Sequence, residues 1–424
     1  MPRSLTIPWR MWYGREALAL DWPEGWEVDV RPMADAPALS DEEVAALLAQ
    51  PDGSPPLAEL ARGRRDCCIL VDDLTRPTPA SRIVPHLLRE LRAAGIADED
   101  VTFVVANAVH GALKRPALDK KLGPEVCDRF VVMRHDAHRN LVPVGDVPGI
   151  GEVLVNRFVH AADLKVAVTG VMPHFMCGFS GGAKIVMPGA CGLETVARTH
   201  EHTVEGPPAR VGVVEGNAMR RLMEECAARV GLEFCVNCVF NSEGALSALS
   251  CGAPGPSHAV AVAEARRTYA TDVLYGADVA VFNAFPKDTE FIQAMAALNV
   301  WADRGDAGRA LVRPGGSIVA ITACSEGLGV HGLIEYGRRQ FVRRDRHGSF
   351  RGMLAGRNLL LLAPNVSTST VHLYYPPEAL HFREWGPLRR ALEAFHPQGA
   401  RVAVYPTSAL QLDRAALALT GQGT

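Results

Sequence analysis

Residues 66–73 read DCCILVDD, an apolar run between charged residues, and the helix-breaking run TRPTP follows at 75–79. A helical pattern comes next, IVPHLLRELRAAG, which ends at Gly95. A second apolar run, VTFVVANAVH, then covers 101–110. Apolar runs that alternate with helices are typical of a parallel sheet that is covered on both faces. This stretch therefore predicts an α/β fold.

The same alternation extends along the chain in two series. The first series adds strand candidates at 129–136 and 164–174. The second has a helix from about Glu290 to Arg304, and its strand candidates lie at 278–285, 317–324, 358–363 and 400–406.

We predict two α/β domains with mainly parallel sheets and an active-site cleft between them. The N-terminal domain is expected over 1–270 and the C-terminal domain over 275–398. The final strand, within 400–424, can pack back on the first domain.

Composition narrows the choice of partners. The chain has 424 residues, and 44 Lys and Arg against 47 Asp and Glu give a net charge of −3. A chain without a basic field is not expected to bind nucleic acid. The first residues, MPRSLTIPWRMWYGRE, lack the apolar segment of a secretory signal, and the uncharged stretch 166–183 contains Pro173 and His174. We therefore expect a cytoplasmic protein without a membrane span.

The cysteines favour structural roles. Ten cysteines in a chain of this length do not form a disulfide framework. Cys235 and Cys238 form a CxxC, which permits a metal or redox role, but the surrounding LEFCVNCVF is typical of a buried strand.

Polar residues gather where the strands of the first series end. Ligands bind beyond the carboxyl ends of parallel strands. Asp73, Thr75 and Arg76 follow the first strand, and His110 and His174 end two others. We expect an arginine and two candidate acid/base imidazoles at one edge of the sheet; a fourth strand ends in His135 and Asp136, which belong to the same edge.

The segment GFSGGAKIVMPGACG at 178–192 places Lys184 in a glycine-rich loop. The triplet Ala183-Lys184-Ile185 is not a Walker A motif, and no GxGxxG opens a βαβ unit. The lysine is then a candidate to bind phosphate, to bond a cofactor covalently, or simply to face solvent.

His200 and His202 follow in RTHEHTVEG. Two positions apart on a helix, they point to different faces and would not chelate one metal together. At most one imidazole ligand is expected here, so other ligands of a metal would come from an organic group.

The second series carries PKDTEFIQAMAAL at 286–298. Asp288 is a candidate N-cap, and Gln293 lies off the apolar stripe, where it faces either a cleft or solvent. Downstream, PGGSIVAITACSEGLG brings Glu326 to a turn at the ligand edge of the second sheet.

Taken together, these motifs resemble one known family. DLTRP at 73–77, the strand-end His110, PHFMCGFSGGAKIVMPG at 173–189 and His200 resemble the nickel-pincer-dependent lactate racemases. The resemblance extends from about Cys67 to the end of the chain and includes the segments around PKDTEFIQA and PGGSIVAITACSEGLG.

The resemblance implies an isomerase and a cofactor. The cofactor would be a nickel-pincer nucleotide, a pyridinium mononucleotide whose sulfur substituents and ring carbon hold nickel, attached covalently at Lys184 as a thioamide. His200 would be the protein ligand to nickel. Enzymes that synthesise the cofactor would be partners, so protein produced alone would be inactive.

The resemblance also assigns the other site residues. Asp73, Leu74, Thr75 and Arg76 would line the cofactor pocket, His110 and His174 would be the acid/base pair, and Arg76 and Gln293 would bind substrate. The reaction would be inversion of C2 of a 2-hydroxy acid by proton-coupled hydride transfer, in which a base takes the hydroxyl proton as hydride leaves.

The chain departs from the family pattern in ways that bear on substrate. The position of the carboxylate-binding lysine is Ala296, the residue before the glutamine is Ile292 rather than an aromatic, and Gly111 stands where arginine is common. We therefore expect a 2-hydroxy acid other than lactate, larger or differently charged, such as a sugar acid. The alternatives are pincer-dependent redox or elimination, a non-catalytic cofactor-binding protein, and pyridoxal-phosphate chemistry at Lys184.

Overall fold

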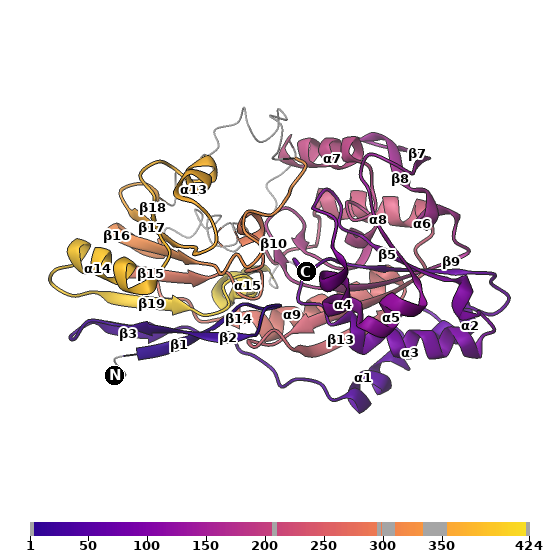
Figure 1. Cartoon of the computed structure of the whole chain (residues 1–424), viewed down its shortest axis with the longest axis horizontal. Coiled ribbons are helices and arrows are strands. Elements are labelled where there is room, and N and C mark those ends of the chain that lie inside the picture. The colour runs from indigo at the N-terminus through magenta and orange to yellow at the C-terminus, as the bar shows by residue number, and fades with distance from the viewer. Residues whose placement is uncertain (1–3, 206–209, 295–297, 299–309, 334–353, 421–424) are drawn as a thin grey trace.

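The computed structural model describes residues 4–205, 210–294, 298, 310–333 and 354–420. It contains two six-stranded sheets, one in each half of the molecule (Figure 1). The first sheet has the order β13 (Leu246–Gly252), β12 (Phe234–Phe240), β9 (Leu164–Gly170), β4 (Cys67–Val71), β5 (Val101–Val105) and β6 (Val131–Arg134). All neighbours in it are parallel except the edge pair β12 and β13.

The second sheet is parallel throughout. Its order is β18 (Leu380–Phe382), β17 (Asn358–Leu362), β16 (Val312–Ile321), β15 (Ala277–Asn283), β19 (Arg401–Tyr405) and β3 (Glu27–Val30). The prediction of two α/β domains with mainly parallel sheets is confirmed.

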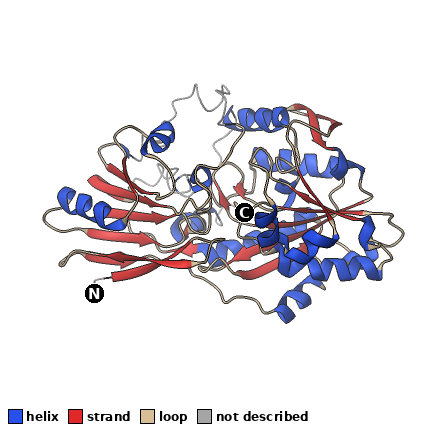
Figure 2. Ribbon diagram, in the orientation of Figure 1, coloured by secondary structure: helices blue, strands red, loops and turns tan. Residues whose placement is uncertain are grey.

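Helices cover both faces of the first sheet, as its apolar strands require (Figure 2). One face packs against α1 (Asp41–Leu48), α2 (Leu57–Leu60), α3 (Ala80–Ala93), α4 (Arg115–Leu122), α5 (Pro124–Arg129) and α9 (Pro254–Tyr269). The other face packs against α6 (Arg157–Ala161), α7 (Leu193–Glu205), α8 (Ala218–Val230) and the hairpin of β7 (Leu141–Val147) and β8 (Gly151–Asn156).

Within the described residues, the second sheet is covered by fewer elements than the first. α13 (Thr368–Tyr374) packs on one face, and α14 (Trp385–Phe395) and the hairpin of β1 (Ser4–Trp9) and β2 (Glu16–Asp21) pack on the other. The remaining elements are β10 (Pro173–His174), β11 (Gly178–Phe179), β14 (Ala270–Thr271), β20 (Leu412–Asp413), α15 (Arg414–Thr420) and the 3-10 turns η1 (Asp98–Asp100) and η2 (Gly182–Ile185).

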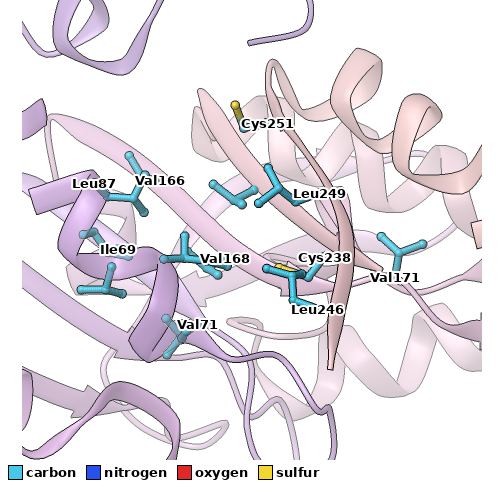
Figure 3. Packing of buried hydrophobic residues seen from close by; sticks show 14 of the residues in the cluster. Ile69, Val71, Leu87, Val166, Val168, Val171, Cys238, Leu246, Leu249 and Cys251 are labelled. Atoms are coloured by element: carbon cyan, nitrogen blue, oxygen red, sulfur yellow. The ribbon is translucent and has the colours of Figure 1, made fainter. Parts of the chain in front are cut away.

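The core of the first domain is built from the inward side chains of β4, β9 and β12. Ile69, Val71, Val166 and Val168 are fully buried and pack with Leu87 of α3 (Figure 3). This contiguous apolar layer holds the three central strands in a fixed register, so the loops at their carboxyl ends start from rigid positions.

Both ends of the chain contribute to the second sheet. Strand β19 pairs with β15 on one side and with β3 on the other. Strand β19 is therefore part of the second sheet, together with residues 27–30 from the N-terminal region, whereas Leu410 and Leu412 further along the chain pack in the core of the first domain. The physical reason is that the buried strand β19 needs a neighbour on each edge to satisfy its backbone groups. The boundaries at 270 and 275 stay a prediction.

Candidate active site

The carboxyl ends of adjacent strands meet at one place, as the sequence pattern predicts. β9, β4 and β5 are neighbours, and they lead to His174, to Asp73 and Arg76, and to His110. From the second sheet, the segment after β15 brings Gln293 to the same place. Thr289 Oγ1 donates to the carbonyl of Leu74 at 3.3 Å, which ties the two domains together beside the site.

His110 is held between two partners. Its Nδ1 donates to Asp73 Oδ2 at 2.7 Å, and Gln293 Nε2 donates to its Nε2 at 3.0 Å. The ring proton is therefore on Nδ1, and Nε2 carries the lone pair. Gln293 is buried and bonds His110, so the solvent-facing alternative for this residue is wrong.

Asp73 is a buried carboxylate that stays ionised. Its Oδ1 accepts from the backbone N–H of Thr75 at 2.9 Å and from the Thr75 hydroxyl. Burial alone would raise the pKa of Asp73, but the charge and hydrogen bond of His110, the Thr75 hydroxyl and the Arg76 guanidinium together hold it well below its usual range. The carboxylate therefore fixes the orientation and tautomer of His110.

The loop that carries Asp73 is anchored by a buried ion pair. Lys121 Nζ donates to Asp72 Oδ1 at 2.8 Å and to the carbonyls of Arg76 and Thr78 at 3.1 Å each. The other oxygen of Asp72 accepts from Thr78 Oγ1 at 2.7 Å and from the N–H of Gly170 at 2.9 Å. The pair thus joins the loop after β4 to the end of β9.

His174 has the opposite proton arrangement. Its Nδ1 accepts from the backbone N–H groups of Met176 and Cys177, at 3.2 and 3.4 Å. A neutral ring then carries its proton on Nε2, which lies 3.4 Å from Lys184 Nζ. Burial, and next the charges of Lys184 and Lys287, lower the pKa of His174 well below its usual range, so the ring is neutral.

Lys184 sits on η2 in the glycine-rich loop, which is held from several sides. Arg220 Nη1 donates to the carbonyl of Gly181 at 3.1 Å, and the N–H of Gly182 donates to Asn237 Oδ1 at 2.8 Å. Burial, and then the charge of Arg76, lower the pKa of Lys184 to about 8. About a tenth of the amine is therefore uncharged and nucleophilic at pH 7, far more than at a lysine of ordinary pKa.

Gly178 shows why this loop needs glycine. Its φ is +73°, and a Cβ there would lie 2.1 Å from the carbonyl oxygen of Val213. Only glycine fits this backbone position.

His200 lies on α7, and its Nε2 has no hydrogen-bond partner in the described residues. Its Nδ1 donates to the carbonyl of Val196 at 2.7 Å, so the lone pair is on Nε2. Burial and the charge of Lys184 lower the pKa of His200 to about 4, although the hydrogen bond to Val196 opposes this. The imidazole is thus neutral. Metal-binding histidines commonly donate one ring N–H to a backbone carbonyl and bind the metal through the other nitrogen, and His200 has this arrangement.

Two cations face the site without a carboxylate partner. Lys287 is buried and makes no side-chain hydrogen bond within the described residues, and Arg76 Nη1 donates only to the carbonyl and hydroxyl of Thr75 there. Burial and the charges of Arg76 and Lys184 lower the pKa of Lys287 well below its usual range. Such a cluster favours an anion.

Some residues singled out in the sequence do not join the site. His135 is buried, and its ring bonds the carbonyl of Cys191 at 2.9 Å and Asn156 Nδ2 at 3.3 Å. Cys235 and Cys238 lie in the buried strand β12 as free thiols, as expected. Asp288 does not cap a helix through its side chain in the described residues; it accepts from the N–H groups of Arg10 and Met11 at 2.7 and 3.2 Å. Ala296, and most of the helix expected from Glu290 to Arg304, fall outside the described residues.

Sequence reasoning missed three groups near the site: Lys287, Glu290 and His331. Lys287 and Glu290 stand in the PKDTEF segment already noted, where charged residues in a segment that resembles the family were the available signal. Burial, followed by the charges of Asp73 and Glu326, raises the pKa of Glu290 to about 8. His331 stands beyond a turn and had no signal in the local pattern.

The fold and the arrangement define an enzyme site suited to acid–base chemistry: two imidazoles with opposite hydrogen-bonding patterns at Nδ1, beside an amine of lowered pKa and a third imidazole whose Nε2 has no partner in the described residues. Residues 13–212 match the family described as the lactate racemase N-terminal domain. Lactate racemase of Thermoanaerobacterium thermosaccharolyticum is 28% identical over 342 residues, 78% of this chain and 77% of that protein. Lactate racemase of Lactiplantibacillus plantarum is 29% identical over 304 residues, 70% and 69% of the two chains.

Solved structures agree on the fold. The lactate racemase apoprotein of T. thermosaccharolyticum superimposes with a TM-score of 0.75 at 22% identity, covering 97% of this chain and all of that chain. A Thermotoga maritima protein gives a TM-score of 0.65 at 18% identity, over 88% and 98% of the two chains. The matched N-terminal half and the two relatives support the lactate racemase family, as the motifs indicated, and the relatives indicate an isomerase of the racemase class.

The residues fit the cofactor that the resemblance implies. The described residues contain no group of three His, Cys, Asp or Glu side chains that could hold a metal ion by themselves. His200 offers a nitrogen without a partner in the described residues, Lys184 and Lys287 offer amines of lowered pKa, and Arg76 offers positive charge. That donor set suits a metal that is held mainly by an organic anion. Within the described part of the chain no helix is long and apolar enough to cross a membrane.

Proposed function

We propose that the chain is a racemase or epimerase that inverts C2 of a 2-hydroxy acid with a nickel-pincer nucleotide. The observation that carries the proposal is the pair of opposite tautomers at His110 and His174. An inversion that removes and returns the hydroxyl proton needs one imidazole with a lone pair at its reactive nitrogen, which takes the proton and gives it back, and a second imidazole N–H can stabilise the oxygen by a hydrogen bond.

The chain's own residues then have distinct roles. His110 Nε2 takes the hydroxyl proton once the substrate hydroxyl replaces the Gln293 amide as its partner. Asp73 holds the charged ring that results. His174 Nε2–H donates a hydrogen bond to the substrate oxygen from the other side. When hydride returns to C2, the His110 imidazolium gives its Nε2 proton back to that oxygen, so both rings end neutral, and the reverse direction uses the same steps.

The cofactor would be held by Lys184, through its amine, and by His200 Nε2. When bound, the nucleotide supplies an electron-poor centre that accepts hydride from C2 and returns it to the opposite face. Asp73, Leu74, Thr75 and Arg76 line the same place. Enzymes that make the cofactor would be the partners that load this chain.

The substrate carboxylate has two candidate partners here. Arg76 and Lys287 present positive charge, and Arg76 has the planar fork that binds a carboxylate through two N–H groups. The family pattern has a carboxylate-binding lysine at the position of Ala296, so in this chain another residue must supply the positive charge. We therefore propose a 2-hydroxy acid larger than lactate, with further hydroxyl groups.

The test uses protein produced together with cofactor-synthesis enzymes. A panel of single enantiomers of lactate and longer 2-hydroxy acids is incubated with it, and products are separated by chiral chromatography. Inversion without net oxidation supports the proposal, and faster inversion of a longer acid than of lactate supports the substrate class. Net formation of a 2-oxo acid or loss of water supports redox or elimination instead.

Attachment is tested by intact mass and nickel content. Wild-type protein is expected to carry the added mass and nickel, the Lys184→Met variant neither the covalent mass nor full occupancy, and the His200→Ala variant less nickel. A Lys184→Met variant with unchanged mass gain would overturn the attachment, and absorbance typical of a pyridoxal aldimine would favour that chemistry.

A further inference from the structure

His331 is brought to the site by a loop that crosses between the domains. The loop runs from Glu326 to Gly332 after strand β16. The N–H groups of Phe291 and Ile292 donate to the carbonyls of Gly327 and Leu328, at 2.9 and 3.1 Å. At its far end, the loop bonds the first domain.

Two contacts fix that far end. The N–H of Gly332 donates to the carbonyl of Val109 at 2.8 Å, and His110 and His331 form an antiparallel β-bridge. The two imidazole rings lie with centroids 5.3 Å apart and planes tilted by 46°. His331 is therefore a direct neighbour of the imidazole that we assign as a base.

The ring of His331 is neutral, and only its Nδ1 is both buried and without a hydrogen-bond partner in the described residues. Burial, and then the charges of His110, His200, Lys184 and Lys287, lower the pKa of His331 well below its usual range. These are the groups of the proposed site, so the ring shares their surroundings.

The position of the His331 proton follows from the burial of its two nitrogens. Nδ1 is buried without a hydrogen-bond partner in the described residues, while the side chain as a whole is only half-buried. An unpaired buried N–H is rarer than an unpaired acceptor, so the proton belongs on Nε2, at the accessible side of the ring.

Gly111 makes room for this arrangement. A Cβ at position 111 would lie 3.3 Å from Val330 Cβ, a tighter approach than side chains normally make. A larger residue there would displace the loop that carries His331. The glycine that departs from the family pattern is thus coupled to the placement of the histidine.

Resting on the proposed function, we propose that His331 is a specificity-determining residue whose Nε2–H donates to a hydroxyl on C3 of the substrate. His110 binds the hydroxyl on C2, and the neighbouring ring reaches the oxygen on the adjacent carbon. The substrate class is therefore a 2,3-dihydroxy acid or a longer polyhydroxy acid.

The charges around the site assign the C3 hydroxyl rather than the carboxylate to His331. The neutral N–H of His331 does not neutralise the charge of a carboxylate. The basic side chains of Arg76 and Lys287 can do so, and neither has a carboxylate partner in the described residues.

The experiment compares two acids that differ by one oxygen: 2-hydroxypentanoate and 2,3-dihydroxypentanoate of matched C2 configuration. Inversion of each is measured on cofactor-loaded wild type and on three variants. His331→Phe keeps a ring against His110 without a donor, His331→Gln keeps an N–H at a similar reach, and Gly111→Leu displaces the loop.

We expect wild type to prefer the dihydroxy acid. His331→Phe should raise KM for that acid by about tenfold while leaving 2-hydroxypentanoate unchanged, and His331→Gln should keep most of the preference. Gly111→Leu should reduce inversion of the dihydroxy acid more than inversion of 2-hydroxypentanoate, because the displaced loop carries His331 and also bonds the strand end of His110. In ¹⁵N-histidine NMR spectra, the Nε2 signal that is lost in the His331→Gln variant should shift on addition of the dihydroxy acid only.

Each contrary result has one meaning. If wild type inverts neither these acids nor any acid of the panel, the proposed function fails. If it inverts both without preference, or if His331→Phe affects both acids equally, the function stands and the role of His331 is overturned.

Discussion

Replacement of Asp73 by asparagine tests the tautomer argument directly. In the wild type, Oδ1 accepts two hydrogen bonds from Thr75 and Oδ2 accepts one from His110. An asparagine has a single side-chain oxygen, so it cannot accept hydrogen bonds from both Thr75 and His110. If the oxygen stays with Thr75, the amide N–H₂ faces His110 Nδ1, which must then accept, and the ring proton moves to Nε2. His110 Nε2 then lacks the lone pair that takes the hydroxyl proton.

The expected loss follows from the charged hydrogen bond. A hydrogen bond to a charged group contributes about 1.5–3 kcal/mol, and each 1.36 kcal/mol is tenfold in rate, so kcat should fall by about 10- to 150-fold. KM should change little, because Asp73 contacts His110 and Thr75 rather than the open side of the site.

The assay is initial-rate inversion of the best 2-hydroxy acid of the panel, expressed per bound nickel so that lost cofactor does not count as lost chemistry. Thr75→Val is the matched control: it removes one hydrogen bond to Asp73 but keeps the carboxylate, and should cost less than tenfold. An Asp73→Asn enzyme with full nickel and kcat within twofold of wild type would refute the tautomer argument.

Three further predictions concern stability, measured by urea or thermal unfolding of the protein. Lys121→Met should lower the free energy of unfolding by about 3–5 kcal/mol, because it leaves the charge of Asp72 buried and unpaired; a loss below 1 kcal/mol would show that the pair is dispensable. Gly178→Ala should destabilise by about 2 kcal/mol or more through its positive φ and the carbonyl it meets, whereas Gly255→Ala, in open space on α9, should be neutral or stabilising, and equal effects would contradict this. Because the pKa of Glu290 is raised from 4.5 to about 8 in the folded state, its stabilising effect is present below pH 4.5 and is lost as the pH rises through 8; Glu290→Gln should therefore flatten the fall in Tm between pH 5 and 8, and parallel curves for the two proteins would show that Glu290 does not titrate in this way.

The first sheet was predictable because its strands are continuous apolar runs. DCCILVDD became β4, and each predicted strand of that series was found with its end shortened, for example 101–110 against Val101–Val105. The residues beyond each shortened end are the turns that carry His110 and His174. Strand ends were placed too late because apolar residues continue into turns that are buried by the site itself.

The second sheet shows what a local pattern does not contain. Glu27–Val30 is short and only partly buried, so nothing in its sequence predicts that it pairs with residues near position 401. His331 was missed for the same reason: its neighbour His110 is more than two hundred residues away, and only the fold brings the rings together. Spacing along the chain identifies groups on one loop, whereas contacts between domains depend on topology.

The pairing of β3 with β19 has a consequence for how the polypeptide is made. Residues 27–30 emerge from the ribosome long before residues 401–404, which are their partner in the described part of the sheet. The early segment remains unpaired until all the residues between the two strands have been translated, and its long-range closure is intrinsically slow. The first sheet contains its own neighbours and does not wait. During synthesis the nascent chain should therefore expose one open sheet edge for most of its life, which makes that edge the natural place for chaperone binding and for aggregation when translation stalls.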